Sequence, residues 1–117
     1  MNTHDCIHLR GLELPVLIGV PEAERAAWQS LQADVSFTVP TRFEAMQDQL
    51  AATVDYSAVA LRLRALAAER PRQLIETLAA EMASCLLQEF GAGRVTLELR
   101  KRILPGCDHV AVSLTRP

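Results

Sequence analysis

The sequence predicts an α+β domain in which two helices pack on one face of a four-stranded antiparallel sheet. Apolar and polar residues alternate in four separate segments, and two stretches with helical apolar spacing lie between the second and the third of these segments. The expected order of elements is therefore ββααββ. Because the helices are segregated from the strands, an antiparallel sheet is favoured. We expect residues 1–117 to form this one domain.

The first two strands are defined by alternation with period two. Apolar and polar residues alternate on both sides of Gly11, which shifts the phase and is typical of a β-bulge, so a strand is expected from about residue 6 to residue 20. The apolar odd positions of residues 31–39 predict a second strand with one wet face, which Pro40 ends. The charged segment 21–28 is expected to be a hairpin-like connection.

Helical spacing begins after Asp55, which is an N-cap candidate, and the first helix is expected over residues 57–69. Pro71 is expected to open the second helix, and Gly91 to close it at its C-terminal cap. Two further alternating segments predict the last strands, residues 95–99 and 110–114. A sheet of this kind has open edges, so assembly through the edges into an oligomer is expected.

Composition excludes several classes of function. The formal net charge is -2 and aromatic residues make up 4% of the chain, so nucleic acid is not an expected partner. No apolar stretch approaches the roughly 20 residues of a membrane helix, and the first residues lack the basic start of a signal peptide. We therefore expect a cytoplasmic protein with no membrane partner.

Lys101 is the only lysine among twelve basic residues. The odd-numbered phase of the strand that precedes it would place Lys101 on the apolar face. An amine that is partly removed from water there is suited to proton transfer. The alternative is that the strand has already ended and that the amine extends into water.

Other polar residues allow two interpretations each. Glu76 lies in the first turns of the second helix, where it contacts a ligand or only interacts with the helix dipole. Tyr56, the only tyrosine, follows the N-cap and is by itself more typical of packing. His4 and His8 have metal-ligand spacing only on a helix, and their segment is a predicted strand, so no metal site is expected. Residues 107–109, Cys-Asp-His, are more typical of a turn.

Five motifs are more specific together than apart. They are Ile18-Gly19-Val20; then Glu24, Gln29 and Asp34; Thr53-Val54-Asp55-Tyr56; Leu74-Ile75-Glu76; and Lys101 at the end of an apolar strand. In this order and spacing, over roughly residues 7–116, the chain resembles the dihydroneopterin aldolase family. The single lysine and the single tyrosine both fall on active-site positions of that family.

The resemblance implies a tunnelling fold, in which ββααββ subunits join into a barrel of four and two such rings stack as an octamer, with active sites between neighbouring subunits. It implies a lyase of folate biosynthesis. The enzyme would cleave 7,8-dihydroneopterin into 6-hydroxymethyl-7,8-dihydropterin and glycolaldehyde by a retro-aldol reaction. It would need no cofactor, no metal and no Schiff base, because the dihydropterin ring accepts the electrons.

The resemblance also implies four substrate-binding residues. The Glu76 carboxylate would accept hydrogen bonds from the ring N3–H and the 2-amino group of the pterin, which is a bidentate match. Backbone groups near Val54 and Ile75 would complete the recognition of the pterin edge, and Glu24 would face the polyol side chain.

Lys101 and Tyr56 are the catalytic residues that the resemblance implies, with Lys101 as general base and acid and Tyr56 helping to protonate the enamine intermediate. The family usually has proline after the lysine, whereas Arg102 stands here. The Arg100-Lys101-Arg102 cluster would suit a phosphorylated substrate. The related 2'-epimerase of dihydroneopterin triphosphate, and a pterin-binding paralogue with little turnover, therefore stay as alternatives.

Overall fold

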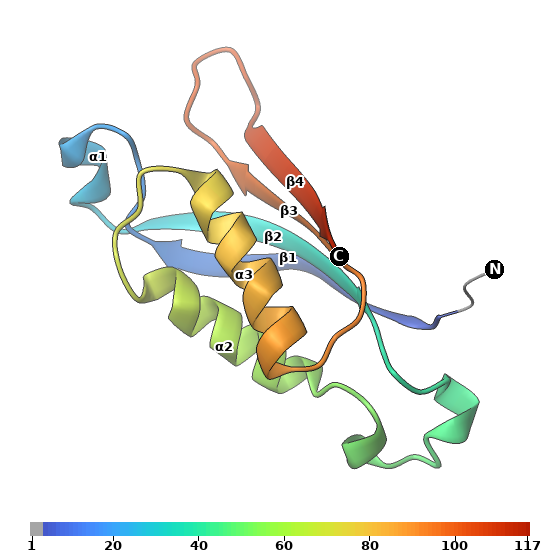
Figure 1. The fold of residues 1–117 in the computed structure, drawn as a ribbon. Coiled ribbons are helices and arrows are strands. Elements are labelled where there is room, and N and C mark those ends of the chain that lie inside the picture. The colour runs from blue at the N-terminus through green and yellow to red at the C-terminus, as the bar shows by residue number, and fades with distance from the viewer. Residues whose placement is uncertain (1–3) are drawn as a thin grey trace.

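The computed structural model describes residues 4–117, in which a four-stranded antiparallel sheet carries two long helices on one face (Figure 1). The strands follow one another in the sheet in chain order. Their bounds are β1 Cys6–Val16, β2 Gln29–Thr38, β3 Val95–Lys101 and β4 Val110–Arg116. The helices are α1 Glu22–Arg25, α2 Tyr56–Ala68 and α3 Ile75–Glu89, with short 3-10 turns at Phe43–Ala45 and Leu50–Ala52. The predicted α+β class and ββααββ order are confirmed.

The core lies between the sheet and the two long helices. Odd-numbered residues of β2 and β3 point toward the helices and are almost completely buried: Leu31, Ala33, Val35, Phe37, Val95, Leu97 and Leu99. Helix α2 packs mainly on β1, and α3 packs on β3 and β4. The even-numbered residues are polar and form the opposite face, as the alternation predicts. Among residues 4–117, no helix is long and apolar enough to cross a membrane.

The predicted bulge in β1 is confirmed. The register between β1 and β2 shifts between Leu9 and Leu12, and Gly11 adopts a left-handed backbone conformation with φ of +68°. The connection 21–28 is not a simple hairpin, because it contains the one-turn helix α1.

The predicted end of the first strand near residue 20 is wrong, since β1 ends at Val16. Beyond it, Ile18 forms an isolated parallel bridge with Arg72. The Arg72 N–H donates to the Leu17 carbonyl at 3.0 Å, and the Gly19 N–H donates to the Arg72 carbonyl at 3.1 Å. The chain leaves the sheet because these hydrogen bonds hold it beside the connection between α2 and α3.

Local sequence sets some of the boundaries of α2 and α3, and contacts between residues distant in sequence set others. Asp55 caps α2 as predicted, and its carboxylate accepts from the Ser57 N–H at 3.0 Å. Gly91 follows Phe90, the C-cap residue of α3, and its φ of +62° suits the position after a C-terminal cap. The predicted opening of the second helix at Pro71 is wrong, because α3 begins at Ile75. Residues 70–74 instead form the connection that pairs with the segment after β1.

Arg72 holds this connection in place from the interior. Its side chain is only 2% exposed, and Nε donates to Glu81 of α3 at 2.5 Å. The two terminal nitrogens donate to the carbonyl groups of Leu66 and Ala67 at 3.1 and 3.2 Å. These carbonyls belong to the last turn of α2, where the donors of a further helical turn are missing. The Arg72 side chain therefore ties the end of α2 to the middle of α3, and the Arg72 backbone binds the segment after β1.

Replacing Arg72 by methionine should lower the free energy of unfolding by about 3 kcal/mol, because Glu81 and two buried carbonyls each lose a charged donor. Arg70→Met is the matched control. Arg70 pairs with the same Glu81 but its side chain is 51% exposed, so the control should cost less than about 1 kcal/mol. Urea unfolding measures both, and equal losses would contradict the role given to Arg72.

Candidate active site

The segment between β1 and β2 carries the first of the expected site residues, Glu24. Gly19 has φ of +150°, and a Cβ atom there would lie 2.4 Å from Cδ of Glu24. Gln29 secures the same segment, since its side-chain nitrogen donates to the carbonyls of Ile18 at 2.6 Å and Glu24 at 2.9 Å. Arg25 donates to the Gly19 carbonyl at 2.9 Å. The Glu24 side chain thus runs directly across a backbone position where only glycine leaves enough room.

Lys101 is the last residue of β3, where it pairs with Val110 of β4. It continues the buried odd-numbered phase of the strand, and its side chain is 12% exposed. The amine donates to the carboxylate of Glu24, whose side chain is 23% exposed. The alternative in which the amine extends freely into water is therefore wrong.

Glu76 is the second residue of α3 and is exposed. At this position its carboxylate interacts favourably with the positive end of the helix dipole. Glu76, Glu24 and Lys101 line one cavity of about 220 Å³. Its other walls are mainly apolar and come from the segment after β1, the start of α3 and the ends of β3 and β4: Val20, Leu74, Ile75, Ile103 and Val110.

The chain does not bring Val54 and Tyr56 to this cavity. They lie before and at the start of α2, at the opposite end of the molecule from the connection between β3 and β4 (Figure 1). Helix α2 has 13 residues, so its length of about 20 Å separates Tyr56 from the end near Arg72. Val54 is buried, whereas Tyr56 is 58% exposed. Within one chain the six expected residues therefore divide into a group of four and a group of two.

A second cavity, of about 630 Å³, lies beside the first and shares Lys101 with it. Its lining includes Arg100, Arg102 and His109. The cluster of positive charge expected here is already paired. Arg100 contacts Asp34 and Glu98, Lys101 contacts Glu24, and Arg102 lies 3.8 Å from Asp108.

The remaining histidine and cysteine motifs do not line the cavity that contains Glu76. His8 Nδ1 lies 2.6 Å from the Ser36 hydroxyl oxygen on the face of the sheet that is opposite the helices. Residues 107–109 belong to the turn between β3 and β4, as predicted. Within residues 4–117 there is no group of three or more His, Cys, Asp or Glu that could hold a metal ion.

Two groups of residues around the site are not found by sequence reasoning. The pattern predicts Arg72 inside a helix, because a proline followed by polar and apolar residues is typical of a helix start. The ion pair between Asp34 and Arg100 joins residues far apart in the sequence, and only the register of β2 with β3 makes them neighbours. Asp34 is visible as part of a motif, but the motif does not identify its partner.

The comparisons with known proteins agree with this geometry. The ββααββ subunit with its open antiparallel sheet is of the tunnelling-fold class. Residues 7–115 match the family described as dihydroneopterin aldolase. A dihydroneopterin aldolase from Streptomyces coelicolor is 34% identical over 115 residues, which are 96% of this chain and 97% of that protein. The chain belongs to the dihydroneopterin aldolase family.

Two solved structures of dihydroneopterin aldolases cover nearly the whole chain. The E. coli protein in complex with neopterin has a TM-score of 0.89 and 25% identity, over 97% of this chain and 99% of that one. The Burkholderia thailandensis protein bound to guanine has a TM-score of 0.78 and 27% identity, over 97% and 90%.

Replacing Gly19 by alanine should displace the Glu24 side chain and weaken its pairing with Lys101. The expected cost is about 2 to 3 kcal/mol of unfolding free energy, since the strained backbone adds to the collision. Gly106→Ala is the control, because Gly106 has φ of +78° but nothing within 4 Å of the added carbon. The control should cost only about 1 kcal/mol. A larger loss at Gly106 than at Gly19 in urea unfolding would refute this explanation.

Proposed function

We propose that this chain is a dihydroneopterin aldolase, which cleaves 7,8-dihydroneopterin into 6-hydroxymethyl-7,8-dihydropterin and glycolaldehyde in folate biosynthesis. The observation that carries the proposal is that Glu76 and the Lys101–Glu24 ion pair line one cavity with apolar walls. The neopterin and guanine in the two related structures support it. Both ligands are flat bicyclic rings with a ring N–H beside an amino group, so one carboxylate can accept from both donors.

Glu76 binds the heterocycle in this proposal. Its carboxylate offers two acceptor oxygens to the adjacent ring N3–H and 2-amino donors, and a charge-assisted pair of this kind gives both affinity and orientation. The backbone at Ile75, next in sequence, adds further contacts to the same edge of the ring. The apolar side chains that line the cavity would pack on the faces of the ring.

Lys101 and Glu24 carry out proton transfer on the side chain of the substrate. Transfer of the ammonium proton of Lys101 to Glu24 leaves a neutral amine, which can take the proton from the 2'-hydroxyl. The C1'–C2' bond then breaks, its electrons move to the C6=N5 bond of the ring, and glycolaldehyde leaves. The proton that Lys101 took from the 2'-hydroxyl then passes to C1' of the resulting enamine, with Tyr56 of the partner subunit helping to deliver it, and this gives the second product. The ring itself accepts the electrons, so the proposed mechanism uses neither a metal nor a Schiff base.

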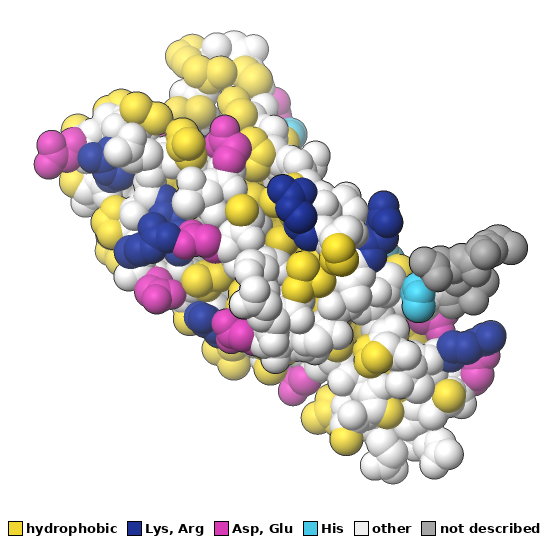
Figure 2. Space-filling view, in the orientation of Figure 1, with side chains coloured by type: hydrophobic (Ala, Val, Ile, Leu, Met, Phe, Trp, Pro, Cys, Tyr) yellow, Lys and Arg dark blue, Asp and Glu magenta, His cyan; other side chains and the backbone are white. Residues whose placement is uncertain are grey.

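The complete site would require a neighbouring copy of the chain. Tyr56 and Val54 lie too far from the Lys101 cavity to act in the same protomer, so we assign the second half of each site to the partner subunit. Exposed apolar side chains support such contacts at both ends of the molecule (Figure 2). They include Ile103 and Leu104, 48% and 55% exposed, near the cavity, and Phe43 and Leu50, 52% and 66% exposed, before α2. Rings of four that stack as octamers are the assembly we propose.

Unphosphorylated dihydroneopterin is the substrate that the charges favour. A triphosphate would need unpaired cations near the side-chain end of the cavity. The three basic residues there, Arg100, Lys101 and Arg102, each have a carboxylate partner. A phosphate group would have to displace these carboxylates, so no observation favours the epimerase of the triphosphate.

Lys101→Ala should lower kcat by about 10² to 10⁴, because a general acid and base is lost, while the Kd for neopterin changes only severalfold. Glu76→Ala should instead raise that Kd by roughly 10-fold to 100-fold, since two charge-assisted hydrogen bonds are lost. Glu76→Gln should be nearly as damaging, because an amide N–H₂ would face a ring donor. Product analysis with dihydroneopterin and calorimetric titration with neopterin measure these effects.

Glu69→Gln is the control for the charge change, because Glu69 is exposed at the end of α2 and does not line the cavity. It should change neither kcat nor Kd. Glycolaldehyde release by the wild-type protein supports the aldolase. Epimerisation without cleavage, or tight binding of neopterin with no turnover, would replace the proposal by the epimerase or the binding paralogue.

A further inference from the structure

We propose that Asp34 and Arg100 are positioning residues, which hold the amine of Lys101 at the cavity by anchoring the end of β3 from the opposite face of the sheet. The catalytic consequence rests on the proposed function of Lys101. The positioning itself does not, and it can be measured separately.

The backbone of Lys101 has little support on the β2 side. The ladder between β2 and β3 ends at the pair Gln32 and Arg100, whereas Lys101 pairs only with Val110 of β4. Lys101 therefore lies one residue beyond the last contact with β2. Terminal residues of a strand separate easily from the sheet, because few hydrogen bonds hold them. An additional restraint is needed next to Lys101, and Arg100 is the adjacent residue.

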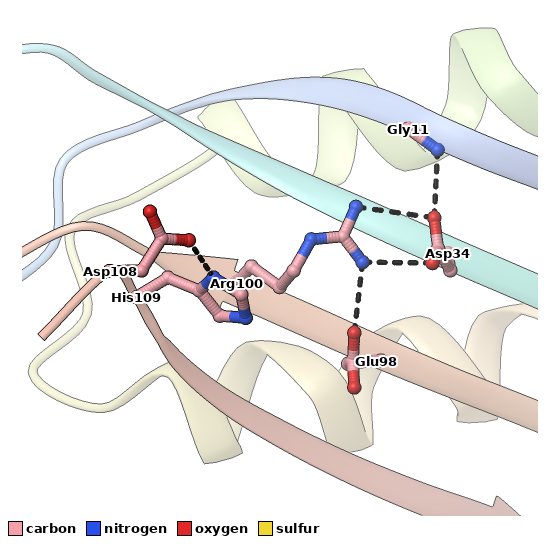
Figure 3. A network of polar contacts seen from close by, with 6 residues as sticks. All are labelled: Gly11, Asp34, Glu98, Arg100, Asp108 and His109. Carbon is pink, nitrogen blue, oxygen red and sulfur yellow. Dashed lines mark hydrogen bonds and ion pairs between the residues drawn. The ribbon is translucent and has the colours of Figure 1, made fainter.

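Arg100 supplies this restraint on the face opposite the helices (Figure 3). Its guanidinium donates to both carboxylate oxygens of Asp34, at 2.8 and 3.3 Å, and to Glu98 at 2.9 Å. The Asp34 carboxylate also accepts from the N–H of Gly11 at 2.8 Å. This contact joins the pair to the bulge of β1, so three strands share one network.

The network is partly shielded from water. The side chains of Arg100 and Asp34 are 18% and 29% exposed. The Arg100 guanidinium, together with the Gly11 N–H, holds the pKa of Asp34 below its usual range, so the carboxylate stays charged near neutral pH. Because both terminal nitrogens of Arg100 donate to carboxylates, we assign Arg100 a role that acts through its neighbour Lys101 rather than through contact with the substrate.

Alternation connects the two faces of β3. Successive side chains of a strand point to opposite faces, so fixing Arg100 on the open face directs Lys101 toward the helices and Glu24. Glu24 is anchored separately, through the hydrogen bond from Gln29 to its carbonyl at 2.9 Å. Each half of the ion pair thus has its own support. Loss of either support would let the amine and the carboxylate separate.

The sole lysine allows a direct test, since acylation of a side-chain amine can occur only at Lys101. The rate of acylation by a succinimidyl ester, followed by peptide-resolved mass spectrometry at one mildly alkaline pH, reports how often the amine leaves Glu24. Arg100→Gln and Asp34→Asn should each raise this rate about tenfold. The amide side chain of the Asp34→Asn variant would keep an oxygen for the Gly11 N–H, so this second variant is expected to keep the bulge even if Arg100→Gln does not fold.

Steady-state kinetics provide the second readout. Both variants should lower kcat about tenfold and leave KM within about twofold, because the reacting amine is misplaced while the heterocycle site at Glu76 is intact. Asp34→Glu, which keeps the charge, should restore part of kcat. Thr96→Val is the matched control on the same face of β3, because it removes only the contact with Thr115 at 3.2 Å, and it should change neither readout.

Unchanged acylation in Asp34→Asn would overturn the proposal, as would an equal increase in Thr96→Val. A rise in KM as large as the fall in kcat would also overturn it, because it would show a general loss of site structure. If the wild-type protein does not cleave dihydroneopterin, the proposed function fails, and the acylation rates still decide whether Asp34 and Arg100 position Lys101.

Discussion

The buried guanidinium of Arg72 is the interaction on which the candidate site depends. It donates to two carbonyls in the last turn of α2 and pairs with Glu81 of α3. The backbone of the same residue forms hydrogen bonds with the segment after β1, which leaves the sheet there. Glu76 follows Arg72 in the chain by four residues, and Gly19 pairs directly with it. Two walls of the cavity, the segment after β1 and the start of α3, are therefore positioned by the residue that carries this buried charge. A charge is costly to bury, and full hydrogen bonding is what makes this arrangement stable.

The two faces of the sheet have different roles. The face that carries the helices provides the core and directs Lys101 to Glu24, whereas the open face holds the polar network around Arg100. Adjacent residues of β3 thereby belong to different environments, as strand geometry requires. In the assembly that we propose, a neighbouring subunit completes the site at the end of the sheet, which would account for one chain containing only part of the expected residues.

Local patterns predict those elements whose formation depends on local sequence. Alternation predicts β2 and β3, and the cap at Asp55 predicts the start of α2, each within a few residues. The predicted end of β1 and start of α3 are wrong because the buried Arg72 decides both through contacts distant in sequence. Three of the residues that the resemblance implies, Glu76, Glu24 and Lys101, line one cavity. No pattern shows that Arg100 finds Asp34, since this depends on the register between two strands.

The central claim is that each active site combines Lys101 of one protomer with Tyr56 of the partner subunit. Subunit mixing tests it most directly. Lys101→Ala and Tyr56→Ala variants, each impaired alone, are unfolded together and refolded at equal amounts. If sites form between subunits, random assembly leaves both residues intact in about a quarter of the sites, and that fraction of the wild-type activity should return. A mixture that is no more active than the two variants assayed separately would contradict the account.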